Sequence, residues 1–93
     1  MAAKERTFTM HWGSGVIAEE AQVVNEYHQP TFQLLRYTDG EAAGSVSIRF
    51  AHYSPQGRFQ RSPLMMSEDD IKAMRAALRK TPELRALLKK LVD

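Results

Sequence analysis

The sequence predicts an α+β domain in which an antiparallel sheet of three to five strands is followed by one long and one short C-terminal helix. Residues 31–66 alternate apolar and polar side chains between turn residues, which is the pattern of consecutive strands. Residues 67–93 repeat apolar side chains at helical spacing instead. The 93 residues are enough for one domain, residues 1–93, with an N-terminal segment 1–30 preceding these two parts.

The N-terminal segment contains one predicted strand and one ambiguous stretch. Residues 7–12 alternate Phe8, Met10 and Trp12 with polar side chains, and a strand is expected to end at the glycines of residues 13–15. Residues 16–28 fit either a helix or a strand, and their alanine and glutamate content favours the helix.

Three further strands are predicted between residues 31 and 62. They cover residues 31–38, 45–53 and 58–62, and they are separated by a turn and short loop at 39–44 and by a Pro-x-Gly turn at 54–57. Pro63 cannot donate a hydrogen bond to a sheet, so a bend or an edge is expected before residues 64–66. The result is a meander of neighbouring antiparallel strands.

The strand at residues 45–53 separates two kinds of side chain. Because successive side chains of a strand point to opposite faces, one face receives an apolar set and the other receives Arg49 and Tyr53. The apolar face comprises Val46, Ile48, Phe50 and His52.

The helical part has clear start signals. Ser67 and Asp70 form the pattern of a capping box, and a helix is expected from there to about Lys80. Thr81 followed by Pro82 predicts the start of a second helix that ends near residue 91. Four leucines of this second helix lie at helical spacing and are expected to form core or a dimer interface, because a small domain stabilises a single core only modestly.

The composition argues against catalysis, metal binding and membrane insertion. The chain has no cysteine, and its three histidines lie in separate segments without the spacing of a metal site. No catalytic dyad, nucleophile elbow or phosphate-binding glycine loop is recognisable, so neither an enzyme nor a cofactor nor a small-molecule substrate is predicted. No apolar run is long enough for a membrane span or a signal peptide, and a cytoplasmic location is expected.

The formal charge is +2, and all four cations between residues 28 and 66 are arginines. Arginine favours planar, bidentate and stacked contacts with phosphates, bases or carboxylates. These residues therefore either contact a polyanion or merely border the sheet, and both readings remain open at this point.

The order of motifs resembles the positive-cofactor-four family of transcriptional coactivators and bacterial proteins that bind single-stranded DNA. Three features within residues 32–78 carry the resemblance: the hydrophobic-x-Ile-Arg strand at 46–49, the Pro-x-Gly turn at 54–57, and the strand-to-helix passage at 64–71. The chain departs from the family in having Glu41 and two alanines where relatives carry lysines, and Ser62-Pro63 where relatives are rich in Gly and Lys.

The resemblance implies a curved antiparallel sheet, a homodimer formed through helices, and binding of unpaired nucleotides by cations and aromatic side chains. It assigns strand or turn positions to Arg36, Arg49, Tyr53 and Arg61, and the sequence adds Arg58 and Phe59 as aromatic or cationic neighbours. The expected function is non-catalytic binding of single-stranded nucleic acid in transcription regulation. The alternative is a structural or protein-interaction module that binds no nucleic acid.

Overall fold

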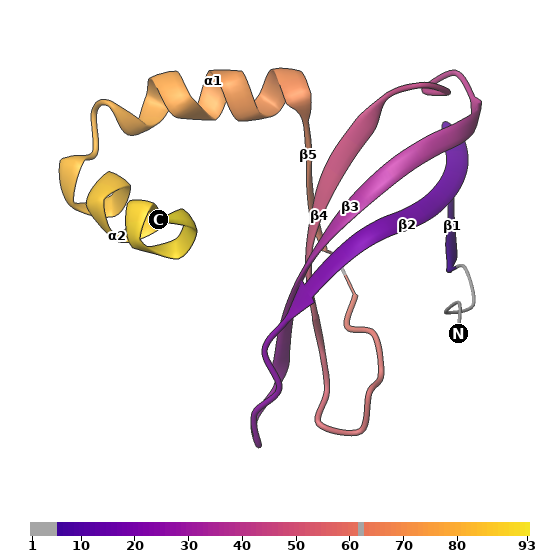
Figure 1. Cartoon of the computed structure of the whole chain (residues 1–93), viewed down its shortest axis with the longest axis horizontal. Helices are drawn as coiled ribbons and strands as arrows, with labels where there is room; N and C mark the ends of the chain where they lie inside the picture. Colours follow the sequence, from indigo (N-terminus) through magenta and orange to yellow (C-terminus); the bar gives the residue numbers. More distant parts are fainter. Residues whose placement is uncertain (1–5, 62) are drawn as a thin grey trace.

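The computed structural model describes residues 6–61 and 63–93 and confirms the α+β prediction. Five antiparallel strands form one sheet in the order β1-β2-β3-β4-β5, and two helices follow it (Figure 1). The elements are β1 (Thr7–Met10), β2 (Gly13–Gln22), β3 (Gln29–Gly40), β4 (Val46–Tyr53), β5 (Leu64–Ser67), α1 (Glu68–Leu78) and α2 (Pro82–Val92).

The prediction of a helix within residues 16–28 is wrong, because residues 13–22 form strand β2. This strand pairs with β1 on one side and with β3 on the other, so its backbone hydrogen bonds go to neighbouring strands. The glycines of residues 13–15, expected to end a strand, lie inside β2 instead. Long-range pairing has overridden the weak local helix preference of the alanines and glutamates.

Strand β2 contains two irregularities in its pairing with β3. The register shifts between Ser14 and Gly15 and again between Ile17 and Glu19. In the second shift Ala18 is the extra residue, so Glu20 faces the same side of the sheet as Ile17. Simple alternation would have sent Glu20 to the opposite side.

The hairpin of β3 and β4 confirms the two strands predicted at residues 31–38 and 45–53 and the loop predicted between them. Its loop uses Gly40 and Gly44, whose φ angles of 84° and 87° favour glycine. The register places Gln33 opposite Arg49 and Leu35 opposite Ser47, so these pairs share one face of the sheet.

The return strand predicted at residues 58–62 does not form as a strand. The turn before it is present, with the Gly57 amide donating to the Ser54 carbonyl at 2.8 Å. After it, one isolated bridge joins Tyr53 to Phe59, and the fifth strand begins only at Leu64. Residue 62, the end of the predicted strand, lies outside the described residues.

The helices begin where the sequence predicts. Ser67 and Asp70 form the reciprocal hydrogen bonds of a capping box. The expectation of one long and one short helix is wrong, since each helix has 11 residues. The side chain of Thr81 does not cap α2 but donates to the carbonyl of Leu78. No helix in the part of the chain that the structure describes is long and apolar enough to cross a membrane.

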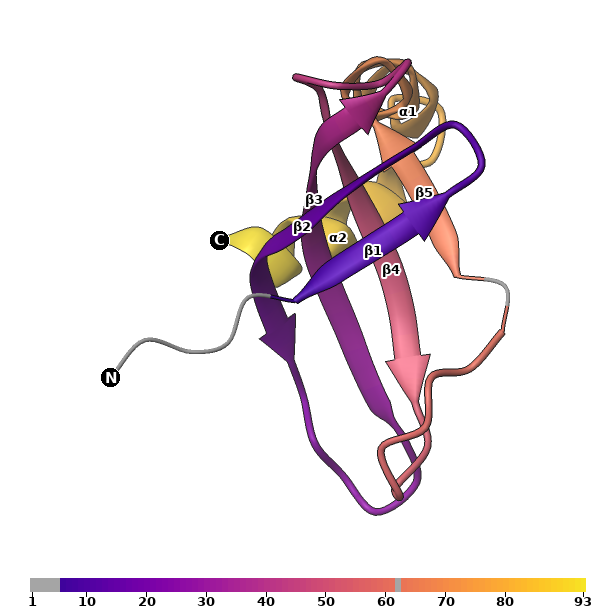
Figure 2. The same cartoon turned by 90° about the vertical axis from the view of Figure 1, so that its right-hand side faces the viewer.

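The sheet has two faces with different coverings, which we call inner and outer. Strand β1 crosses the inner face (Figure 2). There Phe8 packs edge-to-face on Tyr37, with ring centroids 5.0 Å apart. The inner face carries Ile17, Glu20, Thr31, Gln33, Leu35, Tyr37, Ser47, Arg49, Ala51 and Tyr53. The outer face carries Phe32, Leu34, Arg36, Val46, Ile48 and Phe50. The main core therefore lies under the face that bears Arg49.

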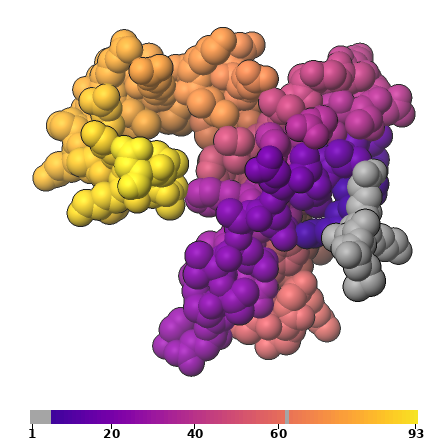
Figure 3. Space-filling view, in the orientation of Figure 1, coloured from indigo at the N-terminus to yellow at the C-terminus, as the bar shows by residue number. Residues whose placement is uncertain are grey.

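The helices project on the side of the sheet opposite β1 (Figures 1 and 2). In the space-filling view they form a lobe that extends away from the sheet (Figure 3). Neither helix contains a buried residue, and the outer face of the sheet is only half covered. The apolar side chains of both helices and of the outer face are thus left without a full covering by residues 6–61 and 63–93 of the same chain.

Candidate nucleic-acid interface

The centre of the candidate site is Gln33, which is only 1% exposed. Its Nε2 donates to Glu20 Oε2 at 2.7 Å and to Tyr53 Oη at 3.2 Å. Its Oε1 accepts a hydrogen bond of 2.6 Å from Arg49 Nε. Because a buried amide is costly to leave unpaired, this arrangement holds Arg49 and Tyr53 in fixed positions on the inner face.

Phe59 completes the cluster from the segment after the 54–57 turn. The guanidinium carbon of Arg49 lies 4.9 Å from the centroid of the Phe59 ring, which is a cation–π contact. The rings of Tyr53 and Phe59 meet edge-to-face with centroids 5.5 Å apart. Phe59 is 43% exposed, so the cluster presents an accessible aromatic ring beside a cation.

Arg6 and Glu20 add an ion pair to this face. Arg6 Nη1 donates to Glu20 Oε1 at 2.9 Å, and Arg6 Nη2 donates to Tyr53 Oη at 3.4 Å. Burial acts to raise the pKa of Glu20, but hydrogen bonds from Gln33 and Arg6 and the charges of Arg6 and Arg49 outweigh it, so the pKa lies below its ordinary value. The hydrogen bond to Glu20 raises the pKa of Arg6.

The predicted contact residues fall into three groups. Arg49, Tyr53 and Phe59 form the cluster on the inner face. Arg58 and Arg61 are exposed in the segment between β4 and β5. Arg36 pairs with Val46 on the outer face, so the thickness of the sheet separates it from the cluster.

Three residues of the cluster were not predicted from the sequence: Arg6, Glu20 and Gln33. The face of Gln33 includes Thr31 and Leu35, and this mixture of polar and apolar residues gave no sign that it would be buried. Glu20 reaches the cluster only because of the bulge at Ala18. Arg6 reaches it because the N-terminal strand folds back, with the Ile17 amide donating to the Arg6 carbonyl at 2.9 Å.

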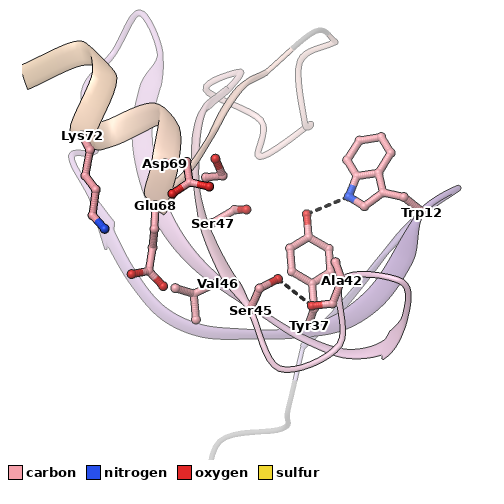
Figure 4. A pocket seen from close by; sticks show the side chains of 10 residues that line it. Trp12, Tyr37, Ala42, Ser45, Val46, Ser47, Glu68, Asp69 and Lys72 are labelled. Atoms are coloured by element: carbon pink, nitrogen blue, oxygen red, sulfur yellow. Dashed lines mark hydrogen bonds between the residues drawn. The ribbon is translucent and has the colours of Figure 1, made fainter.

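A separate open pocket of about 450 Å³ lies where the β3–β4 loop, Trp12 and the start of α1 meet (Figure 4). Trp12 Nε1 donates to Tyr37 Oη at 3.0 Å and fixes the indole at one edge. The opposite edge carries two carboxylates, Glu68 and Asp69, and one cation, Lys72, so it has no excess of positive charge with which to attract phosphate (Figure 4). Within residues 6–61 and 63–93, no three His, Cys, Asp or Glu side chains are grouped closely enough to hold a metal ion.

Comparisons with protein-family models, with curated proteins and with solved structures found no match. The candidate site therefore rests on the residues and geometry of this chain.

The lowered pKa of Glu20 predicts how its contribution to stability depends on pH. Since the fold favours the ionised carboxylate, the contribution is fully present above the ordinary pKa of 4.5 and is lost as the pH falls below it. Glu20→Gln should remove this part of the acid dependence, as urea unfolding at a series of pH values would measure. Glu19→Gln, on the other face, is the control, and equal acid dependence in wild type and Glu20→Gln would contradict the assignment.

Proposed function

We propose that the chain is a non-catalytic cytoplasmic protein that binds single-stranded nucleic acid through the cluster of Arg49, Tyr53 and Phe59. The observation that carries the proposal is the placement of an accessible aromatic ring against a guanidinium group. Bases stack on aromatic side chains, and arginine adds stacking or a phosphate contact. Arg58 and Arg61, exposed in the same segment as Phe59, extend the cationic surface along which a backbone can run.

A single strand suits this surface better than a duplex does. The cluster lies on a sheet face and in an irregular segment, where it can reach unstacked bases. Reading a major groove needs an inserted helix or β-ribbon, and both helices here mix acidic, basic and apolar residues. The resemblance to positive-cofactor-four proteins agrees with this proposal and suggests a role in transcription regulation.

A second candidate function is protein interaction, and the exposed apolar residues of the helices favour it. Leu84, Leu87 and Leu91 are at least half exposed, although they lie on one stripe of α2. An amphipathic stripe of this kind is ordinarily buried against another element. We propose that a second copy of the chain covers it, giving a homodimer through the helices. This assembly is compatible with nucleic-acid binding on the inner face.

The binding proposal is tested by the fluorescence anisotropy of a labelled oligothymidine at increasing salt concentration. Arg49, Arg58 and Arg61 each neutralising one phosphate would give a slope of about −2 for log affinity against log salt, at about 0.7 per contact. The same oligonucleotide annealed to its complement is expected to bind more weakly. Absence of binding at low salt, or binding that salt does not weaken, would exclude the proposal and favour the interaction module.

The assignment of Phe59 is tested by the substitution Phe59→Ala in the same assay. Loss of one stacked base costs about 1–3 kcal/mol, which corresponds to an affinity about 5- to 150-fold lower. Tyr27→Ala is the matched control, because Tyr27 is 77% exposed in the β2–β3 connection and makes none of the contacts that build the cluster. Circular dichroism would check that both variants remain folded. Equal affinities of the two variants would remove Phe59 from the site.

A further inference from the structure

Arg6 is an exposed cation beside the cluster of Arg49, Tyr53 and Phe59. Its side chain is 51% exposed, and its Nη2 atom lies 3.4 Å from the hydroxyl of Tyr53. Its backbone is held by the hydrogen bond from Ile17, so the guanidinium is kept on the inner face. A nucleic-acid strand whose bases stack near Tyr53 and Phe59 would therefore bring a phosphate group close to Arg6.

In the free protein, Arg6 already forms an ion pair with Glu20. One of its carboxylate oxygens accepts from Arg6 and the other accepts from Gln33. If Arg6 turns to another acceptor, Glu20 keeps its hydrogen bond to the buried amide of Gln33. The exchange therefore leaves no buried polar group without a partner.

The geometry points to an exchange in which a phosphodiester replaces Glu20 as the partner of Arg6, so that Arg6 binds nucleic acid and Glu20 limits its affinity. This inference rests on the proposed function. An exposed ion pair is weak, whereas an arginine can hold a phosphate through two parallel charge-assisted hydrogen bonds. Arg6 therefore interacts more strongly with a phosphate than with Glu20. The negative charge of Glu20 meanwhile repels the nucleic-acid backbone as it approaches.

The neighbouring Glu19 provides a matched control. Glu19 lies opposite Leu34 on the outer face, whereas Glu20 lies opposite Gln33 on the inner face. Glu19→Gln and Glu20→Gln change the net charge of the protein equally. A difference between them therefore reports the local ion pair and not the overall field.

The experiment measures the anisotropy of labelled oligothymidine with wild type, Glu20→Gln, Glu19→Gln, Arg6→Gln and the double variant Arg6→Gln/Glu20→Gln. Glu20→Gln is expected to bind about 2- to 5-fold more tightly than Glu19→Gln. Its slope of log affinity against log salt should stay close to that of Glu19→Gln, because Arg6 contacts a phosphate in both variants, whereas Arg6→Gln should flatten the slope by about 0.7. Arg6→Gln should bind more weakly than wild type, and the gain from Glu20→Gln should disappear in the double variant.

The outcomes separate this inference from the function on which it rests. Binding by wild type with equal affinities of Glu20→Gln and Glu19→Gln would overturn the exchange and leave the function standing. Binding unaffected by Arg6→Gln would overturn the role of Arg6 even if Glu20→Gln were unfolded. If neither the wild type nor a folded Glu20→Gln variant binds the oligonucleotide, both proposals are overturned.

Discussion

Replacing Gly15 by alanine is expected to destabilise the protein strongly, by about 3 kcal/mol, at the upper end of the usual cost of overpacking. A Cβ atom at Gly15 would lie 1.9 Å from the carbonyl oxygen of Arg36 and 2.8 Å from the Cα of Tyr37. Both atoms belong to the backbone of β3, so relief requires the β2–β3 pairing to open beside the core. Urea unfolding followed by circular dichroism would measure the loss.

Gly57→Ala is the control for this substitution. Gly57 has a φ of 84° but open space around its position, so alanine there costs only the backbone strain of about 1–2 kcal/mol. The comparison separates a steric clash inside the sheet from a conformational penalty in a turn. A Gly15→Ala variant no less stable than Gly57→Ala would show that β2 and β3 do not approach in this register.

The second large effect is expected for Leu87→Glu in the proposed homodimer. Leu87 is 66% exposed in the single chain, so the change should hardly affect the stability of one copy. In a two-fold symmetric interface the loss of a buried leucine, about 1.5–3 kcal/mol, occurs twice and weakens the dimer at least about 100-fold. Sedimentation equilibrium over a range of protein concentrations would measure the dissociation constant.

Ala86→Glu is the matched control, since Ala86 is exposed on the side of α2 away from the leucine stripe. It introduces the same charge into the same helix and should leave the dimer intact. A wild-type protein that sediments as a monomer at all concentrations would contradict the homodimer. Equal dissociation constants for the two variants would place the interface elsewhere.

Local signals predicted the elements with strong start, turn or alternation patterns. The Ser67 capping box, the proline at the start of α2 and the turns at Gly40 and Gly57 each depend on a few neighbouring residues, and all lie where expected. Strand β2 was not predicted, because its helix and strand preferences are similar and only its partners decide between them. The strand predicted after Gly57 was wrong for the opposite reason. Its sequence is strand-like, but it pairs with a neighbour only through the single bridge between Phe59 and Tyr53.

The candidate site was predicted in part. Arg49 and Tyr53 share a face because they are four residues apart on one strand, and alternation requires this. Their partners come from elsewhere in the chain: Gln33 from β3, Glu20 from β2, Arg6 from the chain before β1 and Phe59 from the segment after β4. No spacing within the sequence predicts such contacts.

The sequence by itself determined the strand of alternating faces, the turn residues, the helix starts and the positions of the arginines. Only the tertiary structure decided which face of the sheet is covered. The apolar side chains of Val46, Ile48 and Phe50 would suggest a core on their side. The two most buried residues, Leu35 and Thr31, lie instead on the face of Arg49. The physical reason is that β1 folds across that face and packs Phe8 on Tyr37, so the inner polar groups must bond to one another.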